Sequence, residues 1–93
     1  MIVGILKVIL FIPASNSLKH KRMILNRLKA RLNRYHNVSV SQIGDIDKWQ
    51  KVTLGISCIG CNRQVIDRKL EDVISYFENF DAVQLVNYEV EMI

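Results

Sequence analysis

Acidic residues are absent from the first 44 positions of this 93-residue chain, where eight lysines and arginines stand unopposed. Residues 45–93 contain five basic and nine acidic residues. The net charge of +4 is therefore the sum of +8 on residues 1–44 and −4 on residues 45–93. Such asymmetry between the two parts of a chain indicates an anionic partner or a surface complementary to a second copy.

Several other features are scarce or missing. Proline occurs once, and the chain has no repeat, no low-complexity linker and no glycine-rich phosphate loop, so we expect a single domain over residues 1–93. Lys7 interrupts the apolar opening run, which is shorter than the roughly 20 residues that span a bilayer. That run also lacks the charged start and small-residue cleavage site of a signal peptide. We therefore expect a cytoplasmic protein without membrane association.

Cysteine and histidine are too few for a readable catalytic or metal site. His20 and His36 have no Ser, Cys or Asp partner at triad spacing. Cys58 and Cys61 form a CxxC, which suggests redox chemistry or half of a zinc site shared between two chains. However, Cys58 falls on the apolar parity of a predicted strand, so we favour two structural thiols in a reducing compartment. We expect no enzyme activity, no cofactor and no metal.

Residues 17–36, SLKHKRMILNRLKARLNRYH, contain seven of the thirteen lysines and arginines and no acid. The apolar residues recur at the spacing of one helical face: Leu18, Leu25, Leu28, Leu32 and Tyr35, with Ile24 on the flank. Lys21 lies within this stripe, so we expect its stem to pack and its ammonium to reach water. Asn16 or Ser17 is placed to cap the helix, and Asn37 to end it.

Six cations of this helix are candidate RNA-binding residues because they lie outside the centre of the apolar stripe: Lys19, Arg22, Arg27, Lys29, Arg31 and Arg34. An ordinary solvated helix face usually mixes charges of both signs, whereas this one has a single sign. Two interpretations stay open, namely a solvated outer face and a surface that faces phosphate groups.

Apolar periodicity predicts six elements: strand 2–12, helix 17–36, strand 38–44, strand 52–59, helix 63–80 and strand 83–92. The first strand is apolar on both parities apart from Gly4 and Lys7, so we expect it to be central and largely covered on both faces. The order β-α-β-β-α-β indicates an α+β, ferredoxin-like fold, a four-stranded antiparallel sheet with two helices on one face. By parity, the open face should carry Val3, Ile5, Lys7, Ile9, Ser39, Ser41, Thr53, Gly55, Ser57 and Leu85.

Three stretches carry a family resemblance: SLKHKR at 17–22, NVSV at 37–40 and GDIDKWQ at 44–50. Together they resemble the signature stretches of the YlxP-like family, small bacterial proteins of unknown function. The resemblance covers essentially the whole chain and implies the same ferredoxin-like fold. It also implies a link to translation, because members are often encoded near translation-initiation and ribosome-maturation factors. It implies no catalytic residues, and Cys58 and Cys61 depart from the family pattern.

The loop at 44–50 contains Asp45, Asp47, Trp49 and Gln50, whose role the pattern leaves open. Two carboxylates at positions i and i+2 beside a tryptophan could bind a cation or position a ligand. They could equally shape the turn, because Asp side chains accept hydrogen bonds from nearby backbone amides. We favour the structural interpretation, in which Trp49 anchors the loop onto the core.

These observations predict a non-enzymatic accessory module that associates with RNA or the ribosome through its basic first helix. Aromatic side chains are scarce on the expected open sheet face, with Phe11 only at its end, so base stacking of the RRM type is not expected there. The alternative is a homo-oligomeric interaction module that uses the open sheet face, because large exposed apolar patches usually mark interfaces.

Overall fold

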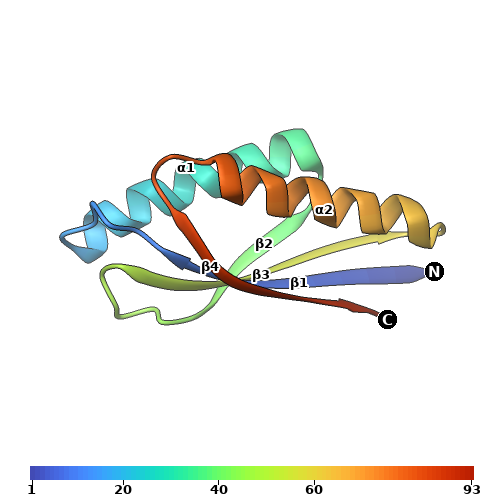
Figure 1. The fold of residues 1–93 in the computed structure, drawn as a ribbon, viewed down its shortest axis with the longest axis horizontal. Helices are drawn as coiled ribbons and strands as arrows, with labels where there is room; N and C mark the ends of the chain where they lie inside the picture. The colour runs from blue at the N-terminus through green and yellow to red at the C-terminus, as the bar shows by residue number, and fades with distance from the viewer.

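The computed structural model describes residues 1–93 and has two helices packed on a four-stranded sheet (Figure 1). The elements are β1 (Ile2–Phe11), α1 (Leu18–His36), β2 (Ser39–Gly44), β3 (Lys51–Gly60), α2 (Arg63–Asn79) and β4 (Gln84–Met92). This order confirms the predicted ferredoxin-like α+β fold. Neither helix has the length and apolar character that crossing a bilayer requires.

The sheet has the strand order β2-β3-β1-β4, and every neighbouring pair is antiparallel. β1 is central, as predicted, but the expectation that both of its faces are covered is wrong. Leu6, Val8 and Leu10 are fully buried on the helix side, whereas Ile5 and Ile9 are only partly buried on the other side. Both helices lie on the same side of the sheet (Figure 1), so the opposite face has nothing above it.

The core lies between the helices and the sheet, and α2 approaches β1 closely. A Cβ atom at Gly4 would stand 2.5 Å from Ile66 Cγ2 and 3.0 Å from Leu70 Cδ1. Glycine therefore allows the first turns of α2 to pack directly on the central strand, since interiors have little free space for an added methyl group.

Local side chains set the helix boundaries. Ser17 caps α1, because its hydroxyl oxygen accepts a hydrogen bond from the His20 amide at 3.0 Å. Asn37 ends α1 in the left-handed conformation with φ of 52°. Asn62 caps α2 by accepting bonds from the amides of the second and third residues of that helix. These caps explain why the helix limits agree with the predicted ones to within one residue.

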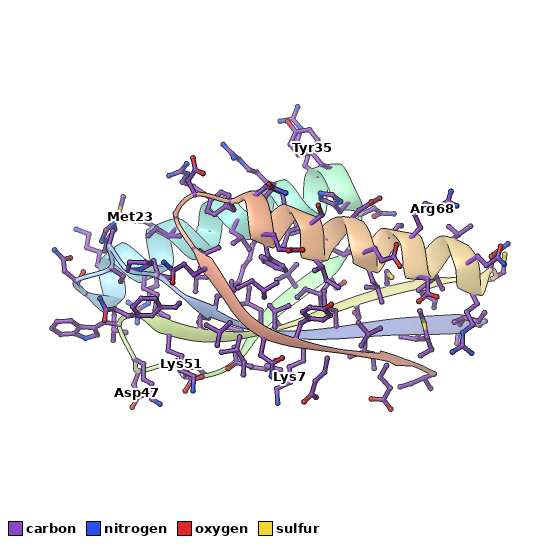
Figure 2. The ribbon with its side chains drawn as sticks, viewed as in Figure 1. Lys7, Met23, Tyr35, Asp47, Lys51 and Arg68 are labelled. Carbon is purple, nitrogen blue, oxygen red and sulfur yellow. The ribbon has the colours of Figure 1, made fainter.

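Tyr35 does not belong to the buried stripe, which corrects the sequence prediction. Its side chain is 70% exposed and points away from the sheet (Figure 2). The guanidinium carbon of Arg34 lies 5.5 Å from the centre of the Tyr35 ring, a cation–π arrangement. The buried stripe ends one turn earlier, at Leu32.

β4 has an irregular register that changes which residues face the core. Ile9 is opposite Asn87, but Leu10 is opposite Leu85, so one additional residue, Val86, bulges between them. Leu85 therefore packs against the core and not on the open face, contrary to the prediction. Beyond the bulge, the open face of β4 presents Asn87, Glu89 and Glu91, the partners of Ile9, Lys7 and Ile5.

β4 is also an edge strand with one outward-facing amide already engaged. Val3 and Ile93 exchange two backbone hydrogen bonds, and in an antiparallel strand pair hydrogen-bonded and non-hydrogen-bonded residue pairs alternate. In this alternation Tyr88 falls at a non-hydrogen-bonded position of β4, so its amide points away from β1. The Asn87 side-chain oxygen accepts a hydrogen bond from this amide at 2.9 Å. Asn87 therefore occupies a position on the edge where a neighbouring strand would pair.

Candidate nucleic-acid interface

The six predicted RNA-binding side chains lie on the outside of α1 and form what we call the basic face. All are exposed except Lys29, which is half-buried. Arg27, Arg31 and Arg34 follow one another at the four- and three-residue spacing that places side chains on the same side of a helix. The buried residues of α1 lie on another side, and all three arginines of this row are exposed.

None of the cations on the basic face has a carboxylate partner. The molecule has two ion pairs, and both are made by Asp45, with Lys48 at 3.2 Å and with Lys51 at 3.7 Å. Arg31 instead lies over the Phe80 ring, with its guanidinium carbon 5.9 Å from the ring centre. An aromatic ring orients a guanidinium group while leaving its N–H donors available to an anion.

Lys21 differs sharply from the other cations of α1. Its side chain is only 2% exposed, and its ammonium donates hydrogen bonds to the carbonyl oxygens of Asp45 at 2.7 Å and Lys48 at 2.5 Å. The expectation that this ammonium reaches water is therefore wrong. Burial lowers the pKa of Lys21, and the carboxylates of Asp45 and Asp47 partly oppose that effect.

Asp45 makes the contacts that shape the loop between β2 and β3. Its backbone is left-handed, with φ of 59°, and its carboxylate accepts a hydrogen bond from the Thr53 hydroxyl at 2.8 Å. That hydrogen bond, followed by contacts with Lys48 and Lys51, lowers the pKa of Asp45 despite some opposing desolvation. Asp47, two residues later, is exposed and makes no side-chain hydrogen bond or ion pair.

Gln50 ties the end of the loop to the segment that follows β1. Its side-chain amide donates to the Pro13 carbonyl at 3.0 Å, and its own carbonyl accepts a bond from the Ile12 amide at 2.7 Å. Trp49 is nonetheless 56% exposed, so the expectation that it anchors the loop onto the core is wrong. Trp49 lines an open hollow of about 820 Å³ between the loop and the ends of β1 and β4.

The two cysteines occupy different environments. Cys58 is buried and Cys61 is exposed, and both are free thiols. Burial raises the pKa of the Cys58 thiol, which disfavours the reactive thiolate form. No group of three or more His, Cys, Asp or Glu side chains is arranged to hold a metal ion.

Comparisons with known proteins agree on the family and on the fold. Residues 3–90 match the family model described as "Protein of unknown function (DUF503)". The "Uncharacterized protein YlxP" of Bacillus subtilis (strain 168) is 33% identical over 70 residues, which cover 75% of this chain and 76% of YlxP. A solved structure, "De novo designed protein Foldit4", superimposes with a TM-score of 0.54 at 14% identity and covers 100% of this chain and 97% of its own. At that identity the likeness concerns the fold alone.

Proposed function

The chain belongs to the DUF503 family of proteins of unknown function, which confirms the YlxP-like resemblance, and we propose that it is a non-enzymatic RNA-binding accessory protein. The basic face of α1 binds the RNA, and the setting is the ribosome or its maturation. The family's gene context, as implied by the resemblance, supports that setting.

The observation that carries the proposal is the absence of carboxylate partners on the basic face. Its exposed cations are concentrated on one helix that contains no acid, and the molecule's two ion pairs lie elsewhere. Clustered unpaired cations repel one another, and phosphate groups relieve that repulsion while releasing counterions. A polyanion therefore complements this surface better than a mixed-charge protein surface does.

The expected mode of binding uses phosphate contacts and shape. Four to six phosphate contacts give an affinity that falls with salt at a log–log slope of roughly −3 to −5. Charge contacts of this kind carry little sequence information. Binding along the helix should therefore be weak and tolerant of sequence.

The test reverses the charge of the arginine row, as Arg27→Glu, Arg31→Glu and Arg34→Glu together. The matched control is Arg63→Glu, Arg68→Glu and Lys69→Glu on α2, which changes the net charge equally. RNA binding is measured by filter retention and by co-sedimentation with ribosomal subunits over a range of salt concentrations. The arginine-row variant should lose binding and its salt dependence, and the control should keep most of both.

Two results would contradict the proposal. One is salt-insensitive or absent RNA binding by the unaltered protein. The other is an equal loss in both triple variants, since that would show a response to net charge and not to the basic face. Circular dichroism should be unchanged, because all three arginine side chains are exposed.

A second candidate function is self-association through the open sheet face. Ile43 and Ile59 on this face are 55% and 62% exposed, and Val3, Ile5 and Ile9 are partly buried beside them. Contiguous exposed apolar residues usually mark an interface, and a two-fold dimer is the commonest way to cover one.

A further inference from the structure

The loop at 45–50 is held at several points, yet it presents its tryptophan to solvent. A buried lysine from α1 joins two of its carbonyls, Asp45 contacts β3, and Gln50 contacts the segment after β1. A loop fixed in this way loses little further conformational entropy when a ligand arrives. The geometry is that of a preorganised binding surface.

The hollow beside the loop is lined by aromatic and aliphatic side chains. Trp49 contributes from the loop, and Ile9, Phe11 and Val86 provide apolar surface from β1 and β4. The volume of about 820 Å³ lies within the range of roughly 300–1,000 Å³ typical of small-ligand sites. The β4 bulge at Val86 contributes directly to this lining.

The rim of the hollow carries polar groups suited to a phosphorylated ligand. Lys48 and Lys51 both line it, and they share a single carboxylate, Asp45. The two positive charges of these lysines therefore exceed the one negative charge of the Asp45 carboxylate. Figure 2 shows Lys51 on the side of the sheet that faces away from the helices. Asn16, whose amide group can both donate and accept hydrogen bonds, also lines the rim.

We propose that this hollow binds a base of single-stranded RNA, stacked on Trp49, with the adjoining phosphate on Lys48 and Lys51. The inference rests on the proposed RNA-binding function and extends its site, since Asn16 at the rim lies just before α1 and the cation Lys19 follows in its first turn. A planar base can stack on the Trp49 ring, and its phosphate can accept hydrogen bonds from Lys48 and Lys51. A purely apolar peptide would offer these lysines no anionic group. Stacking of this kind is sequence-tolerant, because every base has a π face.

The chain allows a direct measurement, because Trp49 is its only tryptophan. The probe is an oligoadenylate of about ten nucleotides, a length within the range that single-strand binding sites cover. Its addition should quench the Trp49 fluorescence. An abasic phosphodiester of the same length should compete for the basic face without the same quenching. Trp49→Ala should weaken oligoadenylate binding roughly 5- to 150-fold, the range for loss of one stacked base, and Trp49→Phe should retain most of the affinity.

The control variant is Tyr88→Ala, which removes an exposed aromatic residue outside both the hollow and the basic face. It should leave affinity and quenching unchanged. If Trp49→Ala binds oligoadenylate as tightly as the unaltered protein, and the binding depends on salt, the proposal that the basic face binds RNA is supported and the inference about the hollow is wrong. Equal quenching by the abasic oligomer would also overturn it. A change in Trp49 emission that depends on protein concentration and not on RNA would assign the hollow to a protein contact instead.

Discussion

Asp45 and Asp47 are two residues apart in one loop, but only Asp45 has partners. Asp45→Asn should lower the melting temperature, because the amide weakens the Thr53 hydrogen bond and removes both ion pairs. Asp47→Asn should melt like the unaltered protein and serves as the matched control. Thermal denaturation followed by circular dichroism measures both, and equal melting temperatures for the two variants would contradict the role given to Asp45.

The same carboxylate predicts a pH dependence with a definite sign. Because the pKa of Asp45 is lowered in the folded chain, its contribution to stability is fully present above the unfolded value of about 3.9. That contribution is lost as the pH falls through the folded pKa. As the pH falls below about 4, the melting temperature of Asp45→Asn should therefore fall less steeply than that of the unaltered protein.

Single-residue patterns in the sequence predicted some of these roles and missed others. Capping by Ser17 and Asn37 depends on neighbours within a few positions, so it can be predicted from the local sequence. The burial of Lys21 and the exposure of Trp49 depend on contacts more than twenty positions away. No local periodicity contains that information, because a lone lysine inside an apolar stripe is compatible both with a buried ammonium and with one that reaches water.

At the level of elements, Lys21 is the link between α1 and the loop that joins β2 to β3. Lys21→Met keeps the volume of the side chain but leaves the carbonyls of Asp45 and Lys48 without a donor. An unpaired buried polar group costs about 1–3 kcal/mol, and the relief of burying no charge offsets part of that. We expect a net loss in the free energy of unfolding of about 1–2 kcal/mol.

Urea denaturation measures this loss. The control is Lys19→Met, which replaces an exposed lysine near the start of the same helix. The lowered pKa of Lys21 means that the unfolded chain binds more protons at pH values between the folded and the unfolded pKa. The stability of the unaltered protein should therefore rise relative to Lys21→Met as the pH climbs toward about 10.4, the unfolded value. An unchanged free energy of unfolding in Lys21→Met would show that the loop does not depend on this link.

Element order was predictable because helices and strands have distinct apolar periods. The errors came from pairing between strands. Parity assigns Leu85 to the open face only if the alternation of β4 is unbroken, and the bulge at Val86 shifts it by one residue. The coverage of β1 was likewise undecidable from its own residues, because apolar side chains on both parities do not reveal whether a second layer exists.

For the whole molecule, the open sheet face predicts a dimer in solution. Ile5 lies near the middle of this face on the central strand, so Ile5→Lys should shift the mass toward the monomer at micromolar concentration. Light scattering measures the mass, and Val65→Lys, which alters an exposed apolar residue on α2, should leave it unchanged. A monomeric mass for the unaltered protein would exclude this mode of association.

The arginine-row variant allows light scattering to test a second mode of association between copies. If the basic face of one copy met the acidic exterior of α2 in another, reversing the arginines would change the mass and leave RNA retention intact. Measuring mass and retention in one preparation therefore separates contact between copies from contact with RNA.

The engaged amide at the edge of β4 has a consequence for aggregation. Two β4 edges that met antiparallel would lose the bond from the Tyr88 amide to Asn87. In a register centred on Val90, Glu89 would stand opposite Glu91 of the next molecule, and in one centred on Glu89 that carboxylate would oppose its own copy. Like charges placed opposite each other destabilise a strand pair. Pairing of two copies through their β4 edges is thus opposed at neutral pH, where both glutamates are ionised.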